Sequence, residues 1–355
     1  MTQHHTPATG DPQPTPLDDA TLESVGRTAS ELLRALDTAV IGQQRVTLAV
    51  ATGVLARGHV LLEGMPGLGK TALIRTLGEA LKLDFGRVQF TPDLMPGDIV
   101  GSPILEERPG GGREMVFREG PVFTNILLAD EINRASPKTQ SALLEAMQER
   151  RVTVMGETRD LPDPFFVLAS QNPIELEGTY PLPEAQLDRF MLKVQIDMPG
   201  TEALERIVAT RRRGEAPATT ASIDRYRLDA VYDALDRVIL PAAVGRYIAR
   251  LVGATHPGSD EAPETVRRFV RHGASPRAAI AIAEAARVVA LLDRRPTVGF
   301  EDVRTIAPDA LRHRLVMSYD AALERTDASQ VIVALLAALD EVGGALPKGV
   351  RVDAT

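Results

Sequence analysis

The sequence predicts an α/β protein in which a parallel sheet lies between helices and a smaller, all-helical domain follows. Three observations indicate this fold. Five short apolar runs alternate with helical segments, a glycine-rich loop links the first run to a helix, and the chain after Pro199 shows helical patterning alone. Short apolar runs separated by helices are typical of parallel strands covered on both faces. The chain of 355 residues, 44% of them hydrophobic, is long enough for two domains.

The chain is expected to begin with a disordered tail over residues 1–18, which is rich in Pro, Thr, Gln and Asp and has little to bury. Residues 19–200 are expected to form the α/β domain, residues 201–346 the helical domain and residues 347–355 a C-terminal tail. Helical patterning begins near Thr21 and continues, after a short break, towards the first strand.

The five strands are expected at residues 59–62, 85–90, 125–130, 165–170 and 191–196. Two hairpins with glycine turns interrupt this scheme. One turns at residues 110–112 and the other at Gly156. We expect both hairpins to be insertions into the α/β domain, and we expect no strand after Pro199.

A loop with the pattern G-x-x-x-x-G-K-[ST] follows the first strand. Its residues are Gly64, Met65, Pro66, Gly67, Leu68, Gly69, Lys70 and Thr71. Between a strand and a helix, this pattern predicts a phosphate-binding loop, because its glycines let backbone N–H groups converge on phosphates at a helix N-terminus. Lys70 is expected to reach the β- and γ-phosphates of a nucleoside triphosphate, and Thr71 to ligate Mg²⁺. The alternative is a glycine turn with an exposed lysine.

Two further strands end in polar residues that suit ATP hydrolysis. The third strand delivers Asp130 and Glu131 at its carboxyl end, which is where open α/β sheets bind ligands. Asp130 is expected to hold Mg²⁺ beside Thr71, and Glu131 to polarise the water that attacks the γ-phosphate. The fourth strand ends near Asn172, whose amide could orient that water and sense the γ-phosphate. The alternative for Asp130 and Glu131 is a strand that simply enters a solvated turn, and the alternative for Asn172 is an Asn-Pro turn.

Composition excludes several classes of function. The net charge of −8 disfavours non-specific electrostatic binding to nucleic acid or to an anionic membrane. The chain has no cysteine, which excludes disulfides, thiol catalysis and cysteine-ligated metals, and its six histidines are scattered. Residues 211–213 form a basic run that we interpret as a solvated helix end. A signal peptide and a membrane span are not expected, and the cytoplasm is the expected location.

The chain resembles the AAA+ ATPases and, within them, the MoxR family, from about Thr21 to Leu346. Six segments carry the resemblance, and they are residues 64–71, 89–98, 128–135, 170–173, 184–190 and 273–278. Residues 89–98 are the most family-specific of these. The resemblance implies a P-loop AAA+ core with a helix-2 insert, which matches the hairpin at residues 110–112. It also implies a hairpin before sensor 1, matched at Gly156, and a helical lid domain.

The resemblance implies roles for four residues whose function the sequence pattern around them does not determine. Asn172 resembles the sensor 1 residue, and Arg189 resembles the arginine finger that reaches the nucleotide of a neighbouring subunit. Arg277 resembles the sensor 2 arginine, which links the lid to the γ-phosphate, and Arg134 is a weaker candidate for a second charge at the subunit interface. By residue type alone, Arg189 and Arg277 would be surface residues.

The segment Ile41, Gly42 and Gln43 matches the part of these proteins that packs against adenine, and its alternative is a turn between helices. The resemblance also implies a homo-oligomeric ring, a hexamer in this family, with both hairpins near its pore. ATP and Mg²⁺ are the implied cofactors. The implied partners are client proteins, including proteins with a von Willebrand factor A domain.

The leading hypothesis is therefore an ATP-hydrolysing ring that remodels or helps to mature a partner protein. A nucleic-acid motor is a second hypothesis, against which the acidic balance and the absence of an added DNA-binding domain count. A third is a nucleotide-dependent scaffold that does not hydrolyse ATP, which the presence of Glu131 disfavours. A metal-chelatase motor subunit is a related alternative, and residues 89–98 favour the MoxR family over it.

Overall fold

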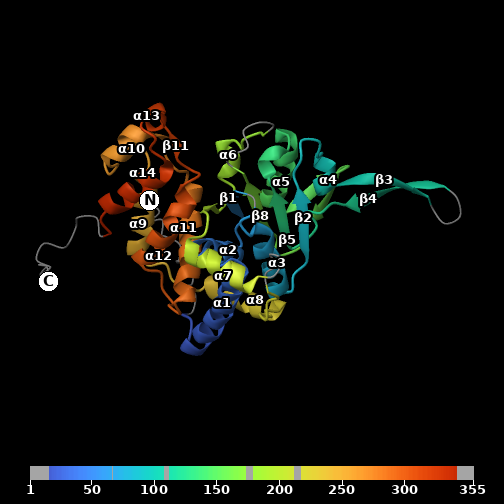
Figure 1. Cartoon of the computed structure of the whole chain (residues 1–355), viewed down its shortest axis with the longest axis horizontal. Helices are drawn as coiled ribbons and strands as arrows, with labels where there is room; N and C mark the ends of the chain where they lie inside the picture. Colours follow the sequence, from blue (N-terminus) through green and yellow to red (C-terminus); the bar gives the residue numbers. More distant parts are fainter. Residues whose placement is uncertain (1–15, 66, 108–111, 173–178, 212–216, 342–355) are drawn as a thin grey trace, which may run out of the picture.

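A five-stranded parallel sheet forms the centre of the molecule, with strand order β2-β5-β8-β1-β9 (Figure 1). The computed structural model describes residues 16–65, 67–107, 112–172, 179–211 and 217–341. The strands are β1 (Val60–Gly64), β2 (Phe85–Gln89), β5 (Ile126–Asp130), β8 (Phe166–Gln171) and β9 (Leu192–Ile196). The predicted parallel sheet is confirmed, with small differences at the strand ends.

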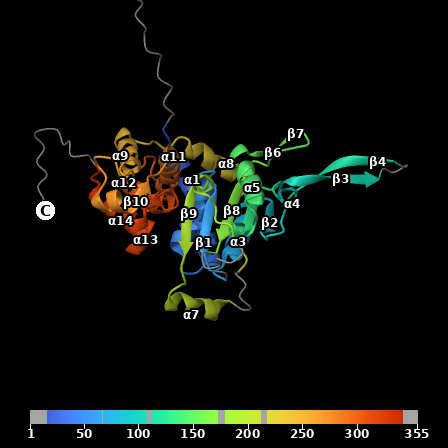
Figure 2. The ribbon, with the colours of Figure 1, turned by 90° about the horizontal axis from the view of Figure 1, so that it is seen from above.

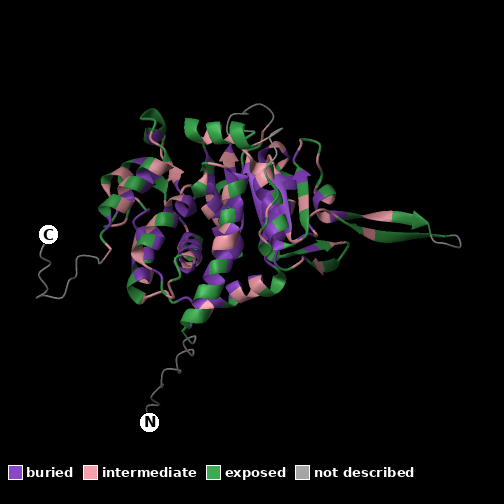
Figure 3. Cartoon of the chain, turned by 60° about the horizontal axis from the view of Figure 1, so that its bottom comes forward, coloured by how far each residue is buried: buried purple, intermediate pink, exposed green. Residues whose placement is uncertain are grey.

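Successive side chains along each strand point to opposite faces of the sheet, and this divides the hydrophobic core into two clusters. Val60 and Leu62 pack into one cluster, whereas Leu61, which points to the opposite face of the sheet, packs into the other. The first cluster includes helices α1 (Asp19–Ala39), α2 (Gln44–Leu55) and α3 (Lys70–Leu81). The second includes α4 (Pro96–Val100) and α5 (Pro137–Glu149). Buried residues therefore fill the sheet and the helix faces that cover both of its sides (Figure 3).

The C-terminal part is mainly helical, and it shares the first core cluster with the sheet. Its helices are α7 (Thr201–Thr210), α8 (Arg225–Leu235), α9 (Ala242–Gly253), α10 (Glu264–Phe269), α11 (Pro276–Leu292), α12 (Phe300–Leu311), α13 (Tyr319–Leu323) and α14 (Ala328–Ala338). The expectation that no strand follows Pro199 was wrong. Strands β10 (Val270–His272) and β11 (Val316–Met317) pair antiparallel, because each extends from a helix end and the two ends meet.

Both expected hairpins are present. Strands β3 (Gly101–Glu107) and β4 (Arg113–Glu119) form a long ribbon that projects away from the sheet (Figures 1 and 2). Strands β6 (Arg151–Val154) and β7 (Glu157–Asp160) form the shorter one, which turns at Gly156 with φ +80°. Gly110 and Gly111 lie outside the described residues. The two hairpins contact each other, because the Arg159 guanidinium lies 4.2 Å from the centre of the Phe117 ring. The remaining short helices are η1 (Ile132–Arg134) and α6 (Glu184–Leu187).

The folded part begins before residue 19, although the tail was expected to continue to residue 18. Leu17 is buried, and the Asp18 carboxylate accepts a hydrogen bond of 2.8 Å from the Thr21 N–H, which caps α1. The expectation for residues 1–15 and for residues 347–355 concerns parts of the chain outside the described residues. Among the helices of the described ranges, none is long and apolar enough to cross a membrane.

Candidate nucleotide-binding site

Three neighbouring strands of the sheet end at one polar cavity of ≈ 450 Å³. Strand β1 leads into the glycine-rich loop, β5 ends at Asp130, and β8 ends just before Asn172. The cavity is lined by Gly67, Gly69, Lys70, Thr71, Ala72, Arg87, Gln89, Asp130, Glu131 and Asn172. Because the strands are parallel, their carboxyl ends lie at the same edge of the sheet, and residues far apart in the sequence meet there.

The glycine-rich loop has the conformation that its glycines permit. Gly67 and Gly69 have φ of +84° and +87°, and Gly69 immediately precedes helix α3. A side chain at Gly64 would place its Cβ 2.7 Å from the carbonyl oxygen of Ile196, so the loop can leave β1 here only with glycine. The Lys70 amine donates a 2.7 Å hydrogen bond to the Gly64 carbonyl, and burial lowers the pKa of Lys70 despite nearby carboxylates.

Asp130 has hydrogen-bond donors on both carboxylate oxygens. The Ser170 hydroxyl donates to Oδ1 at 2.6 Å, and the Arg87 guanidinium donates to Oδ2 at 2.8 Å. Asp130 and the Thr71 hydroxyl line the same cavity and are the kind of oxygen ligands that Mg²⁺ prefers. In the described ranges, no group of three or more His, Asp or Glu side chains could hold a metal ion alone. The residues present fit a metal that takes its remaining ligands from phosphates and water.

Glu131 is held at the edge of the cavity by two side chains. Its φ of +56° turns the chain sharply out of β5 into η1, and its backbone N–H donates to the Ser170 hydroxyl at 3.0 Å. Its Oε2 accepts hydrogen bonds from the Gln89 amide at 2.7 Å and from the Arg134 guanidinium at 3.0 Å. Both side chains contact Oε2, so they compete with an attacking water for that oxygen.

A second, more apolar cavity of ≈ 260 Å³ adjoins the phosphate cavity, and the two share Gly67, Gly69 and Ala72. It is lined by Ala39, Val40, Ile41, Gln43, Gly67, Leu68, Gly69, Ala72, Met198, Pro199, Leu204, Ile207 and Arg211. A mainly apolar cavity beside a polar one suits a nucleotide base and its phosphates.

Ile41 and Gln43 line this cavity, whereas Gly42 does not. Gly42 has φ +78°, and a Cβ there would lie 2.6 Å from the Ala203 Cβ on α7. Its role is therefore to let α7 approach the turn. Met65 is exposed, and Pro66 lies outside the described residues.

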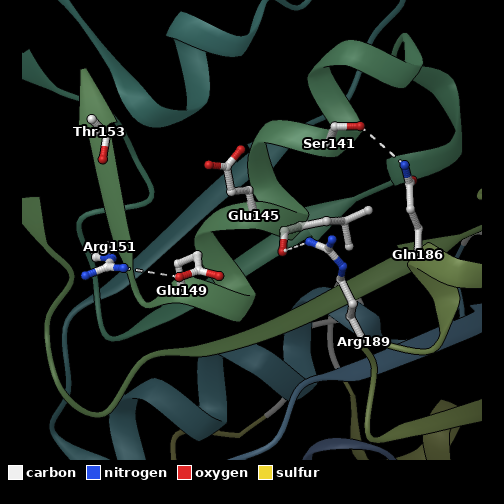
Figure 4. Close-up of a pocket in the computed structure, with 8 residues that line it drawn as sticks. Ser141, Glu145, Glu149, Arg151, Thr153, Gln186 and Arg189 are labelled. Atoms are coloured by element: carbon white, nitrogen blue, oxygen red, sulfur yellow. Dashed lines mark hydrogen bonds and ion pairs between the residues drawn. The ribbon is translucent and has the colours of Figure 1, made fainter. Parts of the chain in front are cut away.

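Arg189 lies in a different place, next to helix α5. Figure 4 shows its side chain beside Ser141, Glu145 and Gln186 in a cavity of ≈ 420 Å³. Its Nη1 donates a 2.7 Å hydrogen bond to the Leu144 carbonyl, and its buried Nε has no hydrogen-bond partner among the described residues.

Arg277 is close to Arg189 and also away from the phosphate loop, since both arginines line another cavity of ≈ 290 Å³. It follows the N-cap of α11, and its guanidinium lies 3.5 Å from the Asp188 carboxylate. Asp188 also accepts hydrogen bonds from Ser275 at 2.9 Å and from the buried Arg314 at 2.7 Å. The C-terminal helical part, through α11 and the segment after α12, is thus joined to the segment that carries Arg189 at one carboxylate.

The predicted site residues fall into two groups at opposite ends of the sheet. Arg189 precedes β9, and the phosphate loop follows β1, which pairs with β9 from Val60 to Gly64. A strand of this length spans about 16 Å. The structure therefore brings Lys70 together with Asp130 but does not bring Arg189 or Arg277 to the phosphate cavity of the same chain.

Sequence reasoning missed Arg87 and Arg211, which line these cavities, and Ser170, which hydrogen-bonds Asp130 beside them. Arg87 precedes Gln89 by two positions on β2, so strand alternation places both on one face at the ligand-binding edge, a signal available in the sequence. Ser170 was part of a recognised motif without a role. Arg211 was interpreted as part of a solvated helix end, but it lines the apolar cavity and donates to the carbonyls at the end of α1.

Comparisons with known proteins agree with this fold. A model of the ATPase family associated with various cellular activities (AAA) matches residues 59–192, and a model of the AAA lid domain matches residues 264–334. Together with the relatives below, these matches show that the chain belongs to the MoxR family of AAA ATPases.

Two relatives carry the family name. "Chaperone MoxR1" of Mycobacterium tuberculosis is 44% identical over 298 residues, which cover 82% of this chain and 77% of that protein. "Protein MoxR" of Methylorubrum extorquens is 31% identical over 343 residues, which cover 91% of this chain and 96% of that protein. A crystal structure from Cytophaga hutchinsonii superposes with a TM-score of 0.81 at 36% identity, covering 91% of this chain and 97% of that one.

Proposed function

We propose that this chain hydrolyses ATP with Mg²⁺ in a homo-oligomeric ring, a hexamer as the family resemblance implies, and thereby changes the conformation of a partner protein. One observation carries the proposal: Lys70 of the phosphate loop, Asp130 with Glu131, and Asn172 come from three separate segments and line one cavity. The adjoining apolar cavity supports a purine nucleotide as the ligand.

The residues of the cavity divide the chemistry among them. Lys70 offsets the charge of the β- and γ-phosphates, while Thr71 and Asp130 would hold Mg²⁺, which when bound neutralises charge that develops on the phosphate oxygens. Glu131 accepts the proton of the attacking water. Asn172 orients that water with its amide.

The position of Arg189 supports hydrolysis between subunits. An arginine finger stabilises charge on the transferring phosphoryl group and must touch it. Because Arg189 and Arg277 lie at the opposite end of the sheet from the phosphate cavity of their own chain, we assign both to the nucleotide of a neighbouring copy. An isolated subunit would then have an incomplete catalytic site.

A mixing experiment tests this assignment. Arg189→Ala and Lys70→Ala should each be nearly inactive alone, Arg189→Ala with normal nucleotide affinity and Lys70→Ala with little. Mixed rings should recover part of the ATPase activity, because an intact phosphate loop in one subunit meets an intact Arg189 in the next. Arg246→Ala, on the exposed face of α9, is the control and should behave as wild type. Verified co-assembly without recovery at any ratio would refute the role of Arg189 between subunits.

The hairpins support contact with a client polypeptide. Leu105 and Met115 are cross-strand neighbours on the β3–β4 ribbon, and both are more than half exposed. Met155 at the turn of the second hairpin is 69% exposed. Large apolar side chains at the tips and faces of projecting ribbons mark interaction sites rather than core. A client with a von Willebrand factor A domain is the partner that the family resemblance implies.

Client binding can be separated from ATP hydrolysis. Glu131→Gln should hold ATP without hydrolysing it and should co-purify with the client. Adding Leu105→Ser and Met115→Ser should abolish this co-purification while leaving ATP binding unchanged, because neither residue lines the phosphate cavity and the β3–β4 ribbon that carries both projects away from the sheet (Figure 1). Client recovery that does not change with the ribbon substitutions would place the client elsewhere.

A further inference from the structure

Arg87 is a second cation inside the phosphate cavity. It lies on β2, lines the cavity together with Lys70, and donates from Nη2 to Asp130 Oδ2 at 2.8 Å. The Arg87 side chain is 46% exposed, whereas that of Asp130 is 16% exposed. The arginine can therefore turn into solvent, while its carboxylate partner stays in place.

Arg87 and a divalent cation cannot share this carboxylate comfortably. Ser170 occupies Oδ1 of Asp130 and Arg87 occupies Oδ2, so a metal at Asp130 would lie next to the guanidinium. Like charges a few ångströms apart repel more strongly beside a largely buried carboxylate than in bulk water. Lys70 is placed differently, because its amine donates to the Gly64 carbonyl rather than to a carboxylate.

We propose that Arg87 is the counter-ion of Asp130 while the cavity holds no metal, and that Mg²⁺ displaces it from this carboxylate when the metal binds. The proposal rests on the proposed function, in which Asp130 helps to hold Mg²⁺. A half-exposed arginine suits this exchange, because its planar fork binds a carboxylate well and its side chain can turn into solvent when the metal takes its place.

Removing Arg87 should therefore change two affinities in opposite directions. It should weaken nucleotide binding without metal and strengthen the binding of the metal itself. Without Arg87, the charge of Asp130 is left unbalanced in the absence of metal, so it repels the phosphates and metal-free nucleotide binding weakens. Metal binding becomes easier, because no cation of the protein competes for Asp130. The factor by which Mg²⁺ strengthens nucleotide binding should therefore rise, an outcome that general misfolding does not produce.

The test measures the affinity of wild type and Arg87→Met for a fluorescent, non-hydrolysable ATP analogue, once with excess EDTA and once with saturating Mg²⁺. In EDTA the variant should bind about 3- to 10-fold more weakly, and the strengthening by Mg²⁺ should rise by about 10-fold. Arg87→Lys keeps the charge but loses the fork, so its affinity in EDTA should stay near wild type and its strengthening by Mg²⁺ should rise less. Arg75→Met, which removes an exposed ion pair with Glu79 on α3, should change neither quantity.

Three results would overturn the proposal. Equal weakening with and without Mg²⁺ would mean that Arg87 always contacts the phosphates. Unchanged affinity in EDTA would mean that Arg87 does not balance the charge of Asp130 in the metal-free cavity. Strengthening by Mg²⁺ that stays the same or falls in both Arg87 variants would mean that Arg87 does not compete with the metal.

Asp130→Asn separates this inference from the proposed function. If Asp130→Asn retains the full strengthening by Mg²⁺, Asp130 does not hold the metal and the proposed function fails at that point. If Asp130→Asn loses the strengthening but Arg87→Met leaves it unchanged, only the exchange proposed for Arg87 fails.

Discussion

Replacing Arg314 by methionine should both destabilise the fold and disable hydrolysis. Arg314 follows α12, and its side chain is 2% exposed. It donates to the Asp188 carboxylate at 2.7 Å and to the backbone carbonyls of Asp188, Phe190 and Met191 at 3.2, 2.8 and 3.1 Å. These residues surround Arg189, so one lid side chain holds the segment that carries the proposed arginine finger.

The size of the effect follows from this geometry. Removing one partner of a buried ion pair costs about 3–5 kcal/mol. Asp188 is 18% exposed and keeps Ser275 and Arg277 as partners, so we expect the lower end, about 3 kcal/mol. For a domain of this size that corresponds to a fall in the melting temperature of about 6–12 °C.

Thermal unfolding, nucleotide affinity and ATPase activity should be measured on the same preparations well below the melting temperature. Nucleotide affinity should stay within about threefold of wild type, because Arg314 is remote from the phosphate cavity, while ATPase activity falls at least tenfold. The control is Arg27→Met, whose partner Glu23 is 3.7 Å away on the surface of α1, and which should cost less than about 1 kcal/mol. A loss in stability as small as that of the control, or parallel losses of affinity and activity, would refute this account of Arg314.

Three further outcomes are expected. Glu131→Gln should lower ATPase activity about 10²- to 10⁴-fold with little change in ATP affinity, and near-normal turnover would move the general base elsewhere. Burial lowers the pKa of His59 from 6.5 to about 4, so its contribution to stability is present above pH 6.5 and is lost as pH falls towards 4. Urea titrations should show about 2 kcal/mol less stability from this residue at pH 5 than at pH 7, and a His59→Gln variant with the same pH dependence as wild type would contradict this. Deleting residues 1–15 should leave the melting temperature nearly unchanged, whereas deleting residues 1–18 should cost about 2–3 kcal/mol through Leu17 and the Asp18 cap; equal melting temperatures would contradict this.

The sheet and the phosphate cavity could be predicted from the sequence because their signals are local. An apolar run followed by glycines and Lys70 specifies strand, loop and helix within a few residues. The tail boundary was placed too late because the burial of Leu17 depends on residues distant in the sequence. The β10–β11 pair was missed for the same reason, since each strand is too short to show a pattern of its own.

The positions of Arg189 and Arg277 required the structure. Their motifs indicated roles at a nucleotide, but whether that nucleotide belongs to the same chain depends on strand direction and on how the lid packs. Arg87 needed both sources. Strand alternation places it on the same face as Gln89, but its place beside Asp130 depends on the pairing of Gln89 with Asp130 in the parallel β2–β5 ladder, which the pattern of either strand alone does not show.

The network at Asp188 connects the lid to the proposed action of the ring. Ser275 and Arg277 begin helix α11, Arg314 follows α12, and all three contact the carboxylate of the residue before Arg189. A shift of the lid relative to the sheet would therefore displace the Arg189 segment directly. Under the proposed function, that segment serves the nucleotide of the neighbouring subunit. The lid position in one subunit would then control hydrolysis in the next. The Arg314→Met variant tests this coupling, because it removes the hydrogen bonds from Arg314 to the Arg189 segment.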